Sequence, residues 1–323
     1  MIERIATHYP STVLTNDQLA AIYPDWPAEK IKEKTGISQR HVASEAECAS
    51  DLAAAVAERI LPAENRQADW LLFCTQTPDY LLPTSACLLQ RRLGLPTSCA
   101  ALDFNLGCSG YVYGLAMASA LINSGQAARV LLLTGDTYTR LIHPEDKATR
   151  TIFGDAGTAT LMSGDSSAKP HSFVLGTDGR GESELIVRAG GARLSRESTT
   201  NNPREALAGC LYMNGPEVFK FTIKAVPKLV SQVLAKAGLT LDQVDLVVFH
   251  QANGYMLEHL RRKLNIPSEK FVLHFAHCGN TVSSSIPIVL EYLLATERLT
   301  QGMRVLIAGF GVGFSWGGCI VDW

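Results

Sequence analysis

Two patterns of apolar residues alternate along the chain. Short continuous apolar runs bounded by glycine, proline and polar residues predict buried strands, and stretches with apolar residues three or four positions apart predict helices. The expected strands are residues 70–75, 101–106 and 129–135 in the first half and 245–250, 271–275 and 304–310 in the second. The expected helices are residues 84–93, 110–124, 254–264 and 282–294. Strands that alternate with helices predict an α/β protein with parallel strands.

The order of these elements occurs twice along the chain, at similar intervals. Each half also ends in a glycine-rich turn that enters an apolar strand, at residues 154–161 and 313–321. We therefore predict an internal duplication, with halves at residues 1–165 and 166–323. The segment 163–202 interrupts the pattern with glycine, serine, aspartate and arginine, and we expect it to form a link followed by a long loop that covers a functional site.

The composition excludes several classes of protein. With 46% hydrophobic and 19% charged residues, the chain is neither disordered nor fibrous. Its 29 Lys and Arg against 31 Asp and Glu give a net charge of -2, so we expect no nucleic-acid partner. The N-terminus lacks the apolar core of a signal peptide, and the longest apolar helix candidate, residues 111–122, is shorter than a membrane span. We expect a cytoplasmic protein with no membrane partner.

The chain has eight cysteines, and none of them forms a CxxC pair. We therefore expect no metal site, and we interpret seven of the cysteines as small apolar residues. Cys108 differs, because it lies between Gly107 and Gly110 where an expected strand turns into an expected helix. The N–H groups at a helix N-terminus favour a thiolate, and the glycines leave room for a substrate. The pattern predicts a nucleophile with a lowered pKa.

Two further polar residues follow expected strands of the second half. His250 ends the strand 245–250, and Asn280 lies between the strand 271–275 and the next helix. If the halves are related by a pseudo-twofold axis, Asn280 is the counterpart of Cys108, and the three strand ends converge. A nucleophile beside two hydrogen-bond donors is suited to acyl transfer through a thioester. The glycine-rich turn 309–317 could add a backbone N–H as an oxyanion donor.

These residues leave the reaction open. A hydrolase would use the histidine as a base and the asparagine to orient it. A decarboxylating condensing enzyme would use both side chains as donors to an enolate oxygen. Periodicity and spacing do not separate the two chemistries. An inactive partner subunit is a third reading, and the intact set of Cys108, His250 and Asn280 argues against it.

Several stretches resemble the β-ketoacyl-acyl-carrier-protein synthase III family of the thiolase-like superfamily. The most specific are LGCSGYVYGLAMA at 106–118, VVFHQAN at 247–253 and GNTVSSSIPIVL at 279–290, and the resemblance extends over nearly the whole chain. It implies a five-layered αβαβα fold, a homodimer, and a catalytic triad of Cys108, His250 and Asn280. It also implies an oxyanion hole made by the N–H groups of Cys108 and Val312.

The family's reaction is implied in the same way. Cys108 would take an acyl group from an acyl-CoA primer, and His250 and Asn280 would assist decarboxylative attack by malonyl-acyl-carrier protein. The product would be the 3-oxoacyl thioester that initiates fatty acid synthesis. Coenzyme A and phosphopantetheine thioesters would be substrates, with no further cofactor. The alternative is a specialised relative that makes a secondary metabolite or lipid, by condensation with, or acyl transfer to, another acceptor.

The resemblance also implies binding residues. Asn253, Gly215 and Phe310 would line the substrate tunnel, and the partner subunit would insert its Leu82 at the end of the acyl pocket. Lysine replaces the tryptophan of some relatives at position 30 and an arginine at positions 34 and 147. Lysine provides neither stacking nor bidentate phosphate contacts. The residues expected to contact coenzyme A or the acidic carrier protein are Lys34, Lys147, Arg150, Lys220, Arg262 and Lys263.

Overall fold

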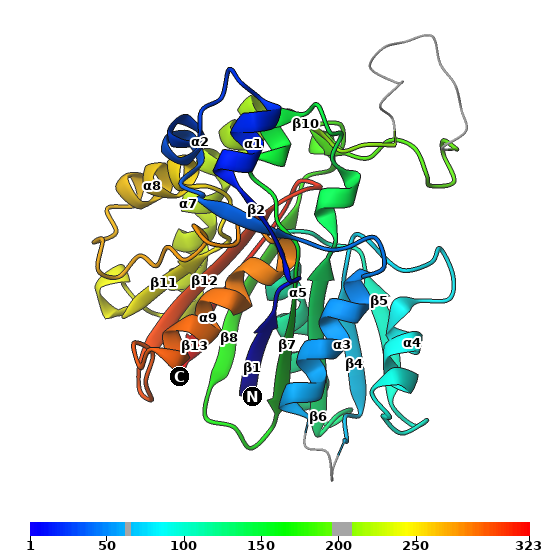
Figure 1. Cartoon of the computed structure of the whole chain (residues 1–323). Coiled ribbons are helices and arrows are strands. Elements are labelled where there is room, and N and C mark those ends of the chain that lie inside the picture. Colours follow the sequence, from blue (N-terminus) through cyan, green and yellow to red (C-terminus); the bar gives the residue numbers. More distant parts are fainter. Residues whose placement is uncertain (62–65, 196–208) are drawn as a thin grey trace.

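The computed structural model describes residues 1–61, 66–195 and 209–323 and contains two larger sheets (Figure 1). The first sheet has five strands, in the order β1 (Ile2–His8), β7 (Ala156–Ser163), β6 (Arg129–Asp136), β4 (Trp70–Cys74) and β5 (Ala100–Phe104). β4 runs parallel to β5 and β6, whereas β7 is antiparallel to both β6 and β1. β5 therefore forms one edge of this sheet.

The second sheet repeats this arrangement. Its order is β11 (Leu246–Phe249), β12 (Arg304–Gly311), β13 (Ser315–Asp322) and β8 (Lys169–Thr177), with β11 parallel to β12 and the other pairs antiparallel. Phe271 forms a parallel bridge to β11, at the position that β5 occupies beside β4. The repeated order and directions confirm the internal duplication. The boundary expected at 165/166 falls between β7 and β8 and stays a prediction.

Helices and sheets form five layers, which confirms the expected αβαβα arrangement. α5 (Gly110–Asn123) and α9 (Ser285–Ala295) share an apolar core with both sheets, so they form the central layer. α3 (Ala49–Ile60) and α4 (Ser85–Arg92) cover the outer face of the first sheet. α7 (Gly215–Ala237) and α8 (Gly254–Lys263) cover the outer face of the second. Figure 1 shows these two outer layers on opposite flanks.

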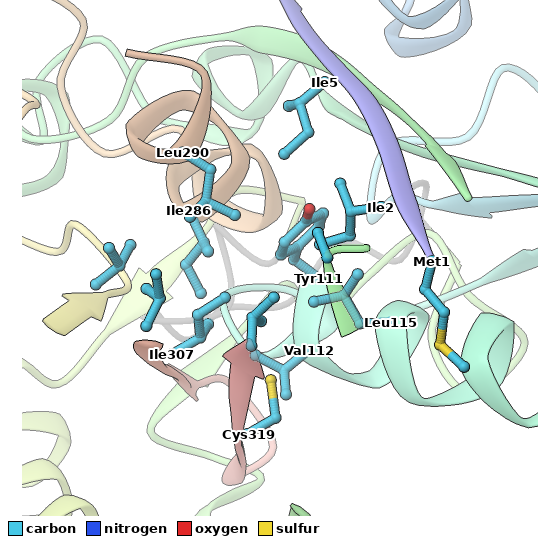
Figure 2. Close-up of a cluster of buried hydrophobic side chains, with 14 of the residues drawn as sticks. Met1, Ile2, Ile5, Tyr111, Val112, Leu115, Ile286, Leu290, Ile307 and Cys319 are labelled. Atoms are coloured by element: carbon cyan, nitrogen blue, oxygen red, sulfur yellow. The ribbon is translucent and has the colours of Figure 1, made fainter. Parts of the chain in front are cut away.

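The central core consists of side chains from helices and strands that are distant in sequence. Figure 2 shows Tyr111 and Leu115 of α5 near Ile286 of α9 and Ile307 of β12. All four side chains are fully buried. Burying a large aliphatic or aromatic side chain stabilises a fold by about 1.5–3 kcal/mol, so this layer fixes how the two halves sit against each other.

Smaller elements gather above the end of the sheets that lies opposite the two termini (Figure 1). Some come from the first half: β2 (Thr12–Thr15), α1 (Asn16–Ile22), α2 (Ala28–Thr35), β3 (Gln39–Val42), the 3₁₀ helix η1 (Tyr138–Leu141) and α6 (Lys147–Arg150). The second half adds η2 (Gly179–Gly181), β9 (Leu185–Ile186) and β10 (Tyr212–Met213), and two 3₁₀ helices, η3 (Leu241–Gln243) and η4 (Val282–Ser284), lie in its connections. Among the described residues, no helix combines the length and apolarity needed to cross a membrane.

Two sequence-based expectations are wrong. Residues 271–275 do not form a strand, because the Gln251 side chain takes the hydrogen bonds that a neighbouring strand would make. Its amide nitrogen donates to the Val272 carbonyl, and its amide oxygen accepts from the N–H of His274. The segment 163–202 contains β8 and β9 rather than only a link and a loop; its last residues, 196–202, lie outside the described part. β8 is an edge strand with partly exposed residues, which hides it from an apolar pattern.

Candidate active site

Cys108 lies in the turn between β5 and α5, two residues before the helix begins at Gly110. Its side chain is only 7% exposed. A Cβ atom added to Gly311 would lie 3.0 Å from the Cys108 sulfur, and one added to Gly309 would lie 2.6 Å from the Cys108 carbonyl oxygen. The end of β12 can therefore lie directly against the cysteine only because glycines occupy these positions.

The surroundings of Cys108 oppose ionisation of its thiol. Burial, assisted by the nearby carboxyl group of Asp136, raises the pKa of Cys108 to about 12. The expectation of a lowered pKa is therefore wrong for the protein without substrate, because lost hydration outweighs the favourable helix end. Burial also raises the pKa of Asp136 to about 7. The Asp136 carboxyl group accepts hydrogen bonds from the Gln76 N–H at 2.7 Å and the Ser283 hydroxyl at 3.1 Å.

His250 follows β11, and its ring is held by a residue that the sequence analysis did not identify. The ring Nδ1 lies 2.7 Å from the hydroxyl oxygen of Ser285, the first residue of α9. Burial lowers the pKa of His250 to about 3, so the ring is neutral at physiological pH. Phe310 packs edge-on against the ring, with centroids 5.8 Å apart. The Ser285 hydroxyl oxygen also lies 3.0 Å from the Val282 carbonyl oxygen, and its single proton can serve only one of these two acceptors. The neutral ring carries its proton on Nε2 in the arrangement in which the hydroxyl donates to Nδ1.

Asn280 is held by backbone contacts from both halves of the chain. Its N–H donates to the Ile152 carbonyl, and its own carbonyl accepts from the Gly154 N–H. Its side-chain oxygen accepts a 2.9 Å hydrogen bond from the Val282 N–H. Because this bond uses the amide oxygen, the side-chain NH₂ group is the end available to a ligand.

One cavity of about 370 Å³ contains Cys108, His250 and Asn280 among its lining residues. The expected tunnel residues Asn253, Gly215 and Phe310 line the same cavity. Asn253 also caps α8, because its side-chain oxygen accepts from the Met256 N–H at 2.9 Å. Phe219 and Tyr255 line the cavity too, and Tyr255 is 68% exposed, which marks the end that opens to solvent. The structure thus brings six of the predicted site residues together.

Val312, the second expected oxyanion donor, lies beside this cavity. A chain of hydrogen bonds links it to the nucleophile: the Ser109 and Ser315 hydroxyl oxygens lie 2.6 Å apart, and the Ser315 hydroxyl donates to the Val312 carbonyl at 2.8 Å. A Cβ atom on Gly107 would lie 2.8 Å from the Val312 side chain. The backbone at Val312 is therefore fixed next to the turn that carries Cys108.

Leu82 does not line the cavity of the single chain. It is 82% exposed, in a loop in which Tyr80 and Leu81 are 61% and 88% exposed. Arg150 lines a separate cavity of about 150 Å³, which shares Phe153 with the larger one.

Three lysines surround the ring of Trp26. The side-chain nitrogens of Lys30, Lys34 and Lys147 lie 5.8, 5.9 and 5.6 Å from the ring centroid. Two of these nitrogens also contact Asp25: Lys147 its carboxylate and Lys30 its carbonyl oxygen, the latter at 3.0 Å. We call Trp26 and the three lysines, Lys30, Lys34 and Lys147, the Trp26–lysine cluster. It carries three positive charges at the surface.

The Trp26–lysine cluster lies near the open end of the cavity. Gly36 ends α2 two residues after Lys34, and a Cβ atom there would lie 3.3 Å from the Cα of Gly254. Gly254 stands between Asn253 and Tyr255, which line the cavity. The exposed residues expected to meet a carrier protein lie on α7 and α8, where Lys220 and Arg262 form ion pairs with Glu217 and Glu258, and Lys263 ends α8.

Sequence analysis missed Ser285 and Asp136, whose contacts join residues far apart in the chain. The position of Ser285 at the start of a helix, five residues after Asn280, is the only sequence signal that could have identified it. Within the described residues, no group of three or more histidine, cysteine or acidic side chains could hold a metal ion. All eight cysteines carry free thiols.

Comparison with known proteins gives one consistent result. The model of the family "3-Oxoacyl-[acyl-carrier-protein (ACP)] synthase III" matches residues 102–179, and the model of its C-terminal region matches residues 234–323. A "Beta-ketoacyl-[acyl-carrier-protein] synthase III" from Xylella fastidiosa is 37% identical over 97% of this chain and 95% of its own.

Solved structures agree with this result. A crystal structure of a 3-oxoacyl-(acyl-carrier-protein) synthase III matches with a TM-score of 0.95 and 49% identity, over 100% of this chain and 99% of the other. A 3-oxoacyl-(acyl-carrier protein) synthase from Burkholderia xenovorans matches with a TM-score of 0.92 and 39% identity, over 99% and 93% of the two chains.

The raised pKa of Cys108 predicts how its alkylation depends on pH. Because only the thiolate reacts, the rate with iodoacetamide should rise about tenfold per pH unit between about pH 7 and 9. Peptide mapping after timed exposure measures modification of Cys108, and the Cys108→Ala variant gives the signal of the other seven cysteines. A rate already constant at pH 7 to 8 would contradict this, since it would mean that the helix end outweighs burial.

Proposed function

Because the chain belongs to the 3-oxoacyl-[acyl-carrier-protein] synthase III family, we propose that Cys108, His250 and Asn280 condense an acyl primer thioester with malonyl-acyl-carrier protein. The protein is an acyltransferase of the β-ketoacyl-acyl-carrier-protein synthase III type, which initiates fatty acid synthesis. The family match favours this function over the specialised alternative. The observation that carries the roles of the three residues is the single cavity that all of them line.

In the first half-reaction, the Cys108 sulfur attacks the carbonyl carbon of the primer thioester, and the coenzyme A thiol leaves. Burial favours the neutral thiol of Cys108, so the sulfur must lose its proton as it attacks, and one proton completes the departing coenzyme A thiol. The N–H groups of Cys108 and Val312 would stabilise the negative oxygen of the tetrahedral intermediate. The contact of Gly311 with the sulfur supports this role, because it brings the backbone that continues into Val312 against Cys108.

In the second half-reaction, malonyl-carrier protein loses carbon dioxide and forms an enolate. The Asn280 NH₂ group and the His250 Nε2–H would donate to the enolate oxygen. A neutral histidine is suited to this task, and the low pKa of His250 keeps the ring neutral. The enolate carbon then attacks the acyl carbonyl, and the Cys108 thiolate leaves. These steps use only side chains, backbone N–H groups and thioester substrates, so the proposal includes no metal or organic cofactor.

A hydrolase would use the same three residues differently. It would need His250 as a base that takes up a proton, and the lowered pKa of its buried ring opposes protonation. Burial of the ring therefore favours donation over proton uptake at this histidine.

We also propose that two chains form a homodimer through β5 and the loop at residues 80–82. β5 is paired on one side only, so its other edge can pair with a second strand. Tyr80, Leu81 and Leu82 add exposed apolar surface in the loop that leads to Ser85, whose N–H donates to Asp103 of β5. In such a dimer Leu82 would lie close to the partner's acyl pocket.

The Trp26–lysine cluster is proposed to bind the phosphates of coenzyme A near the open end of the cavity. Its three ammonium groups suit phosphate, while no aromatic residue at position 30 stacks on the adenine. The acyl carrier protein is proposed to approach across Lys220, Arg262 and Lys263. The charges at Lys220 and Arg262 are partly balanced by their glutamate partners.

The different roles of the triad predict different defects. His250→Ala and Asn280→Ala should still acquire an acyl group on Cys108, within about tenfold of the wild-type rate. Their condensation rate should fall by about 100-fold or more, because an oxyanion donor is missing. Intact mass after an acyl-CoA pulse measures the first step, and carbon dioxide release from malonyl-carrier protein measures the second. Loss of acylation in both variants, or rapid acyl-CoA hydrolysis without a malonyl substrate, would contradict the assignment.

The proposed interface predicts a change in oligomeric state. The wild type should sediment with twice the 35.0 kDa mass of one chain, whereas the double variant Leu81→Asp, Leu82→Asp should sediment as a monomer at micromolar concentration. Two charges per chain at an apolar interface remove favourable burial and add repulsion. Ile22→Asp, at an exposed apolar position on α1, is the matched control and should remain dimeric. Monomeric wild type, or a dimeric double variant, would exclude this interface.

Recognition by charge predicts two properties of the primer. The KM for acyl-CoA should rise at least about threefold between low and moderate salt, because salt screens exposed charges. Removing the adenosine part while keeping the pantetheine phosphate should slow acylation of Cys108 by less than about fivefold. If acyl-phosphopantetheine reacts far more slowly, the adenine is recognised and the proposal for the cluster is wrong. If only acyl-carrier protein reacts, the primer donor is a carrier protein.

A further inference from the structure

Asp136 is a buried carboxyl group to which the proposed reaction assigns no step. It ends β6, a central strand of the first sheet, and it is 1% exposed. One of its oxygens accepts from the Gln76 N–H at 2.7 Å, and the other contacts the Ser283 hydroxyl at 3.1 Å. Burying a carboxyl group opposes folding, so a role for one of these contacts would explain its position.

The contact with Ser283 lies one residue away from the backbone group that orients Asn280. Ser283 is the middle residue of η4, and its neighbour Val282 donates its N–H to the Asn280 side-chain oxygen at 2.9 Å. This hydrogen bond decides which end of the amide is engaged, and it leaves the NH₂ group for a ligand. A shift of η4 would therefore allow the Asn280 amide to turn.

The backbone of Val282 is strained. Its φ is 54°, in the left-handed region that a β-branched side chain disfavours because the Cβ atom crowds the backbone. Such a conformation persists only where the surrounding structure holds it. The Val282 side chain is 1% exposed, and the next residue, Ser283, contacts Asp136 at the end of a buried strand. This contact thus joins a strained segment to a rigid support.

The partner of Ser283 can keep the contact in either protonation state. Burial raises the pKa of Asp136 to about 7, so ionised and protonated carboxyl groups both occur near neutral pH. The Ser283 hydroxyl can donate to the ionised form and accept from the protonated form. Ser284, the next residue, contacts the first sheet through the hydroxyl oxygen of Thr134, 2.7 Å from its own. The first half of the chain therefore supports η4 at two consecutive residues.

We propose that Asp136, acting through the Ser283 hydroxyl, is a positioning residue for Asn280. The contact holds the Val282 N–H against the Asn280 oxygen, so that the amide presents its NH₂ group to the enolate oxygen. This inference rests on the proposed function, because it assumes that Asn280 donates during decarboxylation. It predicts a defect in that step alone, since backbone N–H groups serve the acylation of Cys108.

Ser283→Ala removes the contact and leaves Asp136 and Asn280 in place. Carbon dioxide release from malonyl-carrier protein should fall about tenfold, because a catalytic group that is present but misplaced loses much of its effect. Acylation of Cys108 by acyl-CoA should stay within about twofold of the wild-type rate, because its donors are not moved. Intact mass measures acylation, and trapped carbon dioxide measures the second step.

Ser50→Ala is the matched control. Ser50 is 5% exposed on α3, and its hydroxyl donates to Asp79 at 2.6 Å, so this variant also removes a buried contact between a serine and an aspartate. Neither residue lines the cavity that contains Asn280. Both half-reactions should stay within about twofold of the wild type.

The Asn280→Ala background separates positioning from general stability. Adding Ser283→Ala to it should lower carbon dioxide release by less than about twofold further, because no amide remains to be oriented. Asp136→Ala should reproduce the fall of about tenfold, and Ser283→Ala should not deepen that fall, since the same contact is removed once. If Asp136→Ala fails to fold by circular dichroism, the Ser283→Ala variants decide the question.

The possible failures can be told apart. Unchanged carbon dioxide release in Ser283→Ala, an equal fall in both half-reactions, or the same fall in the Asn280→Ala background overturns the inference. A folded Asp136→Ala protein with the wild-type rate of decarboxylation overturns the role of Asp136. A wild type that is acylated on Cys108 but releases no carbon dioxide from malonyl-carrier protein refutes the proposed function itself.

Discussion

The burial of α5 and α9 in one layer between the two sheets is the constraint on which the site depends. Both helices begin at the same end of that layer. α5 follows β5 in the first half, and α9 follows the segment at Phe271, which takes the corresponding place beside β11 in the second half. Cys108 precedes one helix, and Asn280 precedes η4 and the other. Apolar packing far from the chemistry therefore sets the relative placement of these residues, and hydrogen bonds such as that between Ser285 and His250 refine it.

The same burial determines the charge states of the site. Excluding water raises the pKa of Cys108 and lowers the pKa of His250, so both side chains are neutral in the protein without substrate. A neutral histidine can donate a hydrogen bond without bringing a positive charge into the cavity. An oxyanion formed during the reaction then meets fixed donors in place of water, which strengthens each contact.

The α/β architecture and the convergence of strand ends could be predicted because apolar periodicity and glycine turns are local signals. Residues whose partners are distant in sequence could not be predicted. Phe271 forms only a bridge because a side chain, Gln251, replaces a strand partner. The hydrogen bonds between Tyr138 and Gln76 and between Ser285 and His250 likewise join residues that only the folded chain brings together. The thiol pKa was misjudged because sequence reveals the helix end but not the extent of burial.

Burial of the Asp136 carboxyl group near Cys108 reduces the stability of the fold at neutral pH. An aspartate whose pKa is about 7 when folded and near 3.8 when unfolded binds its proton more tightly in the native state. The stabilisation that the folded state gains from binding this proton is present below about pH 4. It is lost as the pH rises from about 4 to about 7, and it stays lost above that range. At 1.36 kcal/mol per pKa unit, the loss is on the order of 4 kcal/mol. The rest of the core must offset this penalty for keeping a carboxyl group, joined to both halves by Gln76 and Ser283, beside the nucleophile.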